Sequence, residues 1–163
     1  MKKDLKKIIT LVSELDEIDG RKKFQKIVYI LKQLGINFNE KYKFHYYGPY
    51  SPKLQLEIDS LVNGEILKEE KEGNAYNYKV LLEDNEYIIS DFFSDEVKKL
   101  IAELKEYRSY ILELVATFFY LKEKGYKKEE VIKKKTSILK SNLEEFIDEA
   151  YDIFDNIQNK NLC

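Results

Sequence analysis

The chain is most constrained by residues 20–67, where two strongly patterned helical segments flank a tyrosine-rich connector. The first segment gathers its apolar side chains on one face at helical spacing, and Gly35 follows it, as is typical of a helix C-terminus. The second begins with Ser51 and Pro52, which favour the cap and the first turn of a helix, and ends before Gly64. The sequence therefore predicts two helices with clear boundaries.

A two-stranded ribbon is predicted directly after the second helix. Residues 65–82 place apolar side chains in alternation on two arms, with Gly73-Asn74 as the bend between them. Upstream, residues 4–15 have the pattern of a first amphipathic helix. The order of helix, helix, connector, helix and ribbon is that of a winged helix-turn-helix.

The rest of the chain is helical in pattern from Ser94 onward. Its last helix, residues 146–157, is apolar over a broad arc, so it should bury against another helix or form a dimer seam. We therefore predict a mainly α fold with a small β-hairpin. A winged helix-turn-helix domain occupies residues 1–82, and a C-terminal helical region, residues 83–163, packs on it or mediates formation of a homodimer.

The composition favours a cytoplasmic protein. The one cysteine, Cys163, is the last residue, which excludes an internal disulfide and a cysteine metal site. Apolar runs stay well below the roughly 20 residues needed to span a bilayer. Residues 1–20 also lack the apolar core of a signal peptide. We therefore expect a soluble protein that contacts no membrane.

The sequence offers few groups from which an active site could be built. One histidine and one terminal cysteine allow neither a catalytic triad nor an HExxH zinc motif, and the six glycines form no phosphate-binding loop. Neighbouring carboxylates such as Glu129 and Glu130 would point about 100° apart on a helix, so they would not converge on one substrate. We expect no enzymatic activity, no cofactor and no metal ion.

Charge is divided unevenly along the chain. The net charge is −2, but residues 1–82 hold 15 Lys and Arg against 12 Asp and Glu, whereas residues 83–163 hold 13 against 18. Such asymmetry indicates that the first half meets a polyanion. Ordinary charge on solvated helix faces explains it equally well.

The helix before the connector carries the best basic surface. Lys22, Lys26 and Tyr29 make a polar stripe opposite its apolar face, and three cations at its start are unfavourable unless an anion binds there. Such a surface would contact phosphates without reading sequence, meet an acidic protein partner, or simply face solvent. The candidate nucleic-acid or partner-binding residues are Arg21, Lys22, Lys23, Gln25, Lys26, Tyr29, Ser51, Lys53, Ser60, Asn63, Lys68 and Lys71.

The second helix is a poor candidate for reading DNA by itself. Its predicted outer face presents Leu56, Asp59, Ser60 and Asn63. Recognition in the major groove usually relies on Arg, Lys, Asn or Gln, and a central Asp59 would repel phosphates.

The connector holds the only histidine and a short extended piece around residues 42–46. His45 could bind a ligand or sense pH, although we favour a hydrogen bond from it to a tyrosine hydroxyl or a backbone carbonyl. Tyrosines here could stack on bases, but such rings more often pack into the core. The candidate connector residues are His45, Tyr46, Tyr47, Gly48 and Pro49.

Three stretches carry a resemblance to a known family: GRKKFQKIVYILKQLG, FHYYGPYS and LELVAT. On these the chain resembles the YwgA family of small bacterial proteins over nearly its whole length. More distantly, it is similar to the Panacea group of antitoxin and adaptor domains. The first resemblance implies a winged-helix fold and a bacterial cytosolic setting, and it supplies no reaction, ligand or site residues.

Two functions follow as hypotheses. The first is a DNA-binding transcriptional regulator whose partner is duplex DNA and which forms a dimer through its C-terminal helices. The second is a protein-interaction module, of the antitoxin or adaptor type, that keeps the winged scaffold and does not bind DNA.

Overall fold

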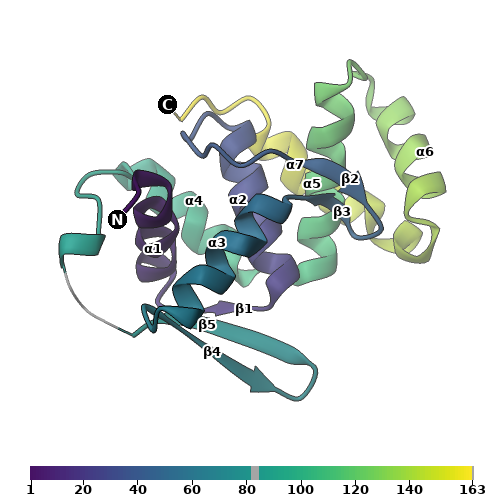
Figure 1. The fold of residues 1–163 in the computed structure, drawn as a ribbon. Helices are drawn as coiled ribbons and strands as arrows, with labels where there is room; N and C mark the ends of the chain where they lie inside the picture. The colour runs from purple at the N-terminus through teal and green to yellow at the C-terminus, as the bar shows by residue number, and fades with distance from the viewer. Residues whose placement is uncertain (82–84, 163) are drawn as a thin grey trace.

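The computed structural model describes residues 1–81 and 85–162 (Figure 1). Within them the chain forms seven α-helices and five short strands, so the prediction of a mainly helical fold with small antiparallel sheets is confirmed. The helices are α1 (Lys3–Leu15), α2 (Arg21–Gln33), α3 (Pro52–Asn63), α4 (Asp95–Glu106), α5 (Ser109–Glu123), α6 (Glu129–Leu139) and α7 (Ile147–Ile157). The strands are β1 (Ile18–Asp19), β2 (Lys43–His45), β3 (Gly48–Tyr50), β4 (Leu67–Glu72) and β5 (Ala75–Val80), with 3₁₀ turns η1 (Asn85–Tyr87) and η2 (Ser141–Phe146).

Local chemistry sets the helix boundaries as predicted. The Ser51 hydroxyl accepts a hydrogen bond from the backbone N–H of Leu54 at 3.2 Å and so caps α3. The Ser94 hydroxyl caps α4 in the same way, accepting from Val97 at 3.2 Å. Gly35 follows α2 with φ +104°, a backbone conformation that residues with a Cβ rarely adopt.

The N-terminal half closes on a three-stranded antiparallel sheet of order β1–β5–β4. The predicted ribbon is β4 and β5, joined at Gly73-Asn74, and its predicted end at Leu82 lies outside the described residues. The sequence did not indicate β1, which pairs Ile18 with Tyr78 on the ribbon. Both of these side chains are buried, so the ribbon is tied to the start of α2.

The connector between α2 and α3 contains the extended piece predicted around residues 42–46, as strand β2, but it is too long for a helix-turn-helix. It runs over residues 34–51 and contains an antiparallel hairpin, β2–β3, that turns at Tyr46-Tyr47 and places Phe44 opposite Pro49. A helix-turn-helix joins its two helices through only three or four residues. The helix-turn-helix part of the predicted fold is therefore not confirmed.

The C-terminal helices pack on the N-terminal half (Figure 1). Helix α5 lies against α2 and hairpin β2–β3, while α7 packs on α5. Phe154 of α7 contacts the rings of Phe118 and Phe119, with centroids 5.5 and 4.8 Å away. The apolar arc of the last helix is thus buried within the chain, and dimerisation through the C-terminal helices stays a prediction.

A continuous hydrophobic core links the two halves. Ile8 of α1, Val28 of α2 and Leu114 of α5 are fully buried members of one cluster. Over residues 1–81 and 85–162, every helix is too short or too polar to cross a bilayer.

Candidate functional site

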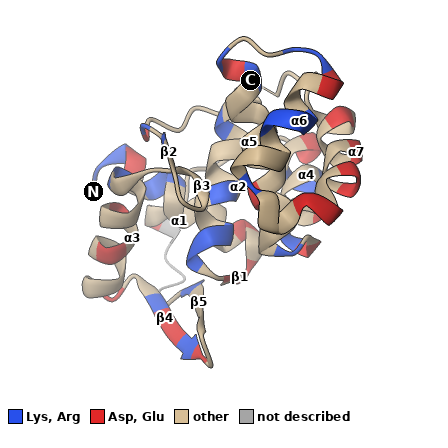
Figure 2. Cartoon of the chain, turned by 90° about the vertical axis from the view of Figure 1, so that its right-hand side faces the viewer, with Lys and Arg blue, Asp and Glu red and all other residues tan. Residues whose placement is uncertain are grey.

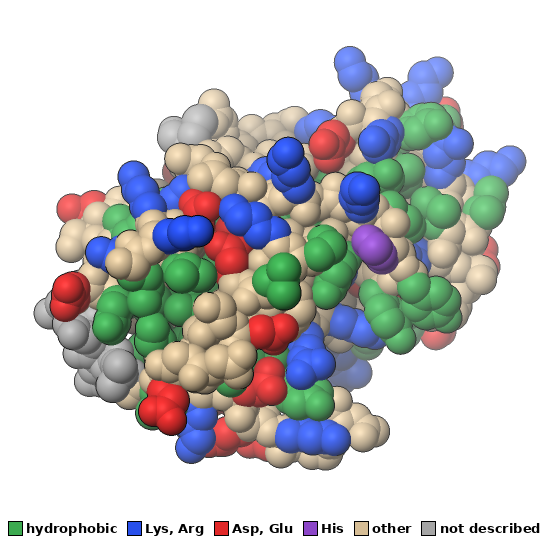
Figure 3. Space-filling model, in the orientation of Figure 1, with side chains coloured by type: hydrophobic (Ala, Val, Ile, Leu, Met, Phe, Trp, Pro, Cys, Tyr) green, Lys and Arg blue, Asp and Glu red, His purple; other side chains and the backbone are tan. Residues whose placement is uncertain are grey.

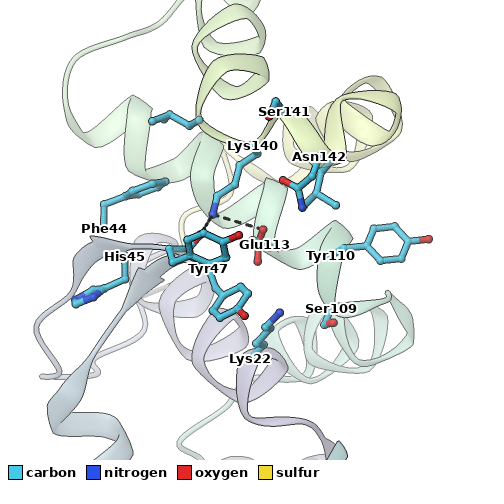
Figure 4. A pocket seen from close by; sticks show the side chains of 13 residues that line it. Lys22, Phe44, His45, Tyr47, Ser109, Tyr110, Glu113, Lys140, Ser141 and Asn142 are labelled. Carbon is cyan, nitrogen blue, oxygen red and sulfur yellow. Dashed lines mark hydrogen bonds and ion pairs between the residues drawn. The ribbon is translucent and has the colours of Figure 1, made fainter. Parts of the chain in front are cut away.

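A cavity of about 520 Å³ opens between hairpin β2–β3 and the helices α2, α5 and α6 (Figure 4). The hairpin supplies aromatic rings to it, and the helices supply charged and polar side chains. Its main lining residues are Lys22, Phe44, Tyr46, Tyr47, Tyr110, Glu113, Lys140 and Asn142.

Two buried polar side chains of α2 fasten the hairpin to that helix. The Gln25 side chain donates to the backbone carbonyl of Ser51 at 3.0 Å and accepts from the Ser51 N–H at 2.9 Å. The Lys26 ammonium donates to the carbonyl of Pro49 at 2.6 Å. Because buried backbone groups need partners, these bonds fix the path of the chain into α3.

A buried ion pair fastens the hairpin from the other side. The ammonium of Lys140, at the end of α6, donates to the carbonyl of Tyr46 and lies 3.5 Å from a carboxylate oxygen of Glu113. Both side chains are buried, and Figure 4 shows Lys140 reaching toward Glu113 on α5. The turn of the hairpin is therefore bound to both α5 and the α6–η2 junction.

Gly48 gives the hairpin a backbone conformation that favours glycine. Its φ is +89°, and a Cβ added there would make van der Waals contacts with α5, 3.4 Å from the Thr117 hydroxyl oxygen and 3.6 Å from Cγ of Glu113. Gly48 and Pro49 form the first part of β3, which packs against α5.

Positive charge exceeds negative charge around these contacts. The pKa of Lys26 is lowered to about 8, mainly by burial, with Lys140 and Lys22 adding to the shift and Glu113 opposing it. Burial also lowers the pKa of Lys140. Three ammonium groups therefore surround one carboxylate, and two of those ammonium groups are buried.

The turn of the hairpin presents two tyrosines to solvent. Tyr46 is 84% exposed and Tyr47 is 49% exposed, and their rings stand nearly perpendicular with centroids 4.9 Å apart. The Lys22 ammonium lies 3.5 Å from the centroid of the Tyr47 ring, which it approaches from α2. The expectation that these tyrosines pack into the core was wrong, because the hairpin carries them beyond the helices.

His45 lies at the edge of this surface. Its ring is exposed and meets the ring of Tyr50 edge-on, with centroids 5.3 Å apart. This contact replaces the hydrogen bond that the sequence suggested. In Figure 4 His45 points away from Lys140, and in Figure 3 hydrophobic side chains flank the histidine on the molecular surface.

The predicted polar stripe of α2 is largely buried, so the expectation that it faces solvent was wrong. Lys26 and Tyr29 are each 1% exposed, and Gln25 is 2% exposed. The Tyr29 hydroxyl donates to a carboxylate oxygen of Glu123 at 3.1 Å, which binds α2 to α5. Hairpin β2–β3 and α5 cover this face, and Lys22 is the member of the stripe that stays exposed.

The other cations at the start of α2 have structural partners. Arg21 donates to the Tyr78 hydroxyl at 3.1 Å and lies 3.6 Å from Glu69, so it ties α2 to the ribbon. Lys23 is buried and pairs with Asp19 at 3.1 Å. The unfavourable charge at this helix start is thus partly offset within the chain.

Helix α3 presents the outer face that the sequence predicted. Leu56 is 69% exposed, and Asp59, Ser60 and Asn63 are also exposed. Lys53 pairs with Asp4 of α1 at 3.0 Å. Ser51 is buried and acts as the helix cap, so it offers no binding surface.

The ribbon has alternating charges, visible as blue and red bands along β4 (Figure 2). Lys68 lies 2.6 Å from Glu70, and Lys79 lies 3.8 Å from the same carboxylate oxygen. Lys71 lies above the ring of Tyr76, 5.9 Å from its centroid. The ribbon is therefore close to neutral.

A second groove, of about 820 Å³, separates α3 and the turn of the ribbon from the α4–α5 junction. Arg21, Lys22 and Arg108 line it, together with Asp59 and Glu106. The starts of α2 and α5 both border this groove, and in neither does a side chain cap the helix. The groove is mildly favourable for an anion.

Two charged residues of the cavity were missed at the sequence level. Glu113 is the one charged residue between Ser109 and Tyr120, and a lone carboxylate within an apolar helix could have indicated a buried partner. Lys140 gave no such signal, because it belongs to a lysine-rich segment. In the described part of the chain, no three His, Cys, Asp or Glu side chains form a group able to hold a metal ion.

These features define a small, mainly helical protein with a charged cavity beneath an aromatic hairpin. Over 157 residues the chain is 37% identical to the uncharacterized protein YwgA of Bacillus subtilis (strain 168), an alignment that covers 93% of this chain and 92% of that protein. The chain therefore belongs to the YwgA family. No family model and no solved structure matches it.

Proposed function

We propose that this chain is an interaction module of the antitoxin or adaptor type, built on a winged-helix scaffold, that binds a protein partner through hairpin β2–β3 in the cytoplasm. The observation that carries the proposal is the exposure of Tyr46 and Tyr47 on a hairpin that is fixed from two sides.

The winged-helix assignment is supported by the order of the elements. Strand β1 lies between α1 and α2 and pairs with the ribbon that follows α3, giving the sheet order β1–β5–β4. A small sheet that packs beside three helices is the arrangement of a winged helix. Hairpin β2–β3 then takes the place of the short turn between the second and third helices.

The aromatic turn suits a protein interface. Tyrosines are enriched in such interfaces because they offer a large contact area at a low cost in conformational entropy. Leu139, 48% exposed at the end of α6, borders the same cavity as Tyr46 and Tyr47. Lys26 and Lys140 hold the hairpin before any partner arrives, so little ordering would be needed on binding.

A pull-down from a bacterial lysate, with the purified chain as bait, tests this proposal. We expect the wild-type chain to retain a protein at stoichiometric amounts and the double variant Tyr46→Ser, Tyr47→Ser to lose it. Tyr126→Ser is the matched control, because Tyr126 is also exposed but lies outside the cavity. Recovery of nucleic acid alone, or equal recovery by the double variant, would contradict the proposal.

A DNA-binding regulator is the second candidate, favoured by the groove beside α3. Lys22 and Arg108 line it, and two helix starts border it. We expect binding to duplex DNA that weakens steeply with salt and drops when Lys22 and Arg108 are changed to Glu. Lys26→Glu would not test this function, because Lys26 is buried and its reversal would disturb the fold. The absence of binding to any duplex at low salt would exclude this candidate.

A further inference from the structure

The cavity beneath the hairpin combines an excess of positive charge with aromatic walls. Lys140 lines it with a side chain that is only 3% exposed, and Glu113 is its one charged partner there. Lys22 lines the same cavity from α2, and Lys26 lies beneath the hairpin. Among the residues that line this cavity, two ammonium groups face one carboxylate, so one positive charge is left for an anion.

The polar groups of the wall are suited to an anionic group. The side chains of Ser109, Ser141 and Asn142 line the cavity and can donate hydrogen bonds. Ser109 is also the first residue of α5, a helix of 15 residues without a side-chain cap, so the positive end of this helix borders the cavity. Hydrogen bonds from charged and neutral donors together are typical of phosphate recognition.

The remaining walls are suited to a flat ring. Tyr46 and Tyr47 line the cavity with exposed rings, and the Lys22 ammonium lies 3.5 Å from the Tyr47 ring centroid. Phe44 and Tyr110 also line it, but their rings pack on Tyr120 and Phe146, with centroids 4.9 and 4.5 Å apart. Aromatic faces of this kind stack on nucleobases whatever their identity. At about 520 Å³, the cavity falls within the range of roughly 300–1,000 Å³ found for small-molecule sites.

We propose that this cavity binds a nucleoside monophosphate, with the phosphate against Lys140, Lys22 and Ser109, and the base against the exposed rings of Tyr46 and Tyr47. The ligand occupies the space beneath Tyr46 and Tyr47, so it would act as an effector next to the surface proposed for the protein partner. The assignment concerns the isolated chain and does not depend on that partner.

Isothermal titration of the purified chain with AMP, GMP, CMP and UMP tests the site. We expect at least one of them to bind saturably. The corresponding nucleoside and inorganic phosphate should each bind at least tenfold more weakly than that nucleotide. Lys22→Gln should weaken nucleotide binding about tenfold, because it removes a cation placed against the phosphate. Lys22 is exposed, so this substitution leaves the fold intact. Lys99→Gln is the matched control, since Lys99 is exposed on α4 and lies outside the cavity.

The outcomes separate clearly. Failure of all four nucleotides to bind, or binding that Lys22→Gln leaves unchanged, would overturn the site. If inorganic phosphate bound as tightly as the nucleotide, the base would contribute nothing to binding, and its assignment to the aromatic side chains would be overturned. Because no partner protein is present in this titration, neither result bears on the interaction proposed for the hairpin.

Discussion

Glu40 of the connector and Glu57 of α3 lie within hydrogen-bonding reach of each other in the protein interior. Both oxygens of Glu40 and one of Glu57 are buried without a hydrogen-bond partner among the described residues. Burial, followed by repulsion from Glu40, raises the pKa of Glu57 to about 7, while Lys53 opposes the shift. A proton shared between the two carboxyl groups supplies a hydrogen bond from an oxygen of one to an oxygen of the other.

The first prediction concerns the pH dependence of this pair. The folded chain keeps the Glu57 proton up to about pH 7, whereas a free glutamate releases it near its ordinary value of 4.5. The contribution of Glu57 to stability is therefore complete below that ordinary value and is lost as the pH rises to 7. Glu57→Gln supplies a permanent donor to Glu40, so this variant should be more stable than wild type at pH 8 by roughly 1–3 kcal/mol.

Urea unfolding between pH 5 and pH 8 measures this effect. The free energy of unfolding of the wild type should fall relative to that of Glu57→Gln across the range. Glu14→Gln is the control, since Glu14 is exposed on α1. Identical pH profiles for Glu57→Gln and wild type would rule out a shared proton.

The second prediction concerns the contact between α2 and the cap of α3. Gln25→Leu leaves the buried N–H of Ser51 without its partner and removes one of the two hydrogen bonds to the Ser51 carbonyl, which still accepts from the N–H of Gln55, so it should cost roughly 1–3 kcal/mol of stability. Gln55→Leu, which removes only a surface hydrogen bond to Asp59, should change stability by less than about 0.5 kcal/mol. Equal losses from the two variants, measured by urea unfolding, would show that the Gln25 bonds do not stabilise the fold.

The helices and the ribbon were predictable because their signals are local. Ser51 with Pro52, Ser94 and Gly73-Asn74 act on their immediate neighbours, so sequence alone sets those boundaries. The exposure of α2 depends instead on what covers it. The periodicity of α2 predicts that Gln25 and Lys26 face solvent, but residues 23 or more positions away in the sequence cover them.

The candidate site was less predictable for the same reason. The sequence drew attention to the tyrosine-rich connector, and the structure places Tyr46 and Tyr47 at the cavity. Their partner Lys140 lies more than 90 residues further along the chain, in a segment rich in lysine. Periodicity carries no information on a contact between such distant positions.

The third prediction concerns Lys26. Its folded pKa of about 8 lies below the ordinary value of 10.5, so the unfolded chain binds this proton more tightly. The buried charge therefore costs stability below pH 8, and this cost is relieved as the pH rises toward 10.5. Wild type should gain roughly 1–3 kcal/mol relative to Lys26→Met between pH 7.5 and pH 10.

Thermal or urea unfolding at several pH values gives that difference. Lys99→Met, which removes an exposed ammonium of α4, should follow the wild-type profile. A Lys26→Met profile parallel to that of wild type would mean that the Lys26 ammonium titrates as it does in water.

The last prediction concerns backbone strain at the hairpin. Gly48→Ala places a Cβ on a backbone with φ +89°, well beyond the left-handed α region near about +57°, so it should cost roughly 1–3 kcal/mol. The new Cβ would lie 3.4 Å from the Thr117 hydroxyl oxygen, an ordinary van der Waals distance, so the cost comes from the backbone. Gly73→Ala has a φ of +62°, within the left-handed α region, and nothing within 4 Å of its Cβ, so it should cost only about 1 kcal/mol. Urea unfolding measures both losses, and equal losses from the two variants would show that the backbone of Gly48 adds no strain beyond that of an ordinary left-handed residue.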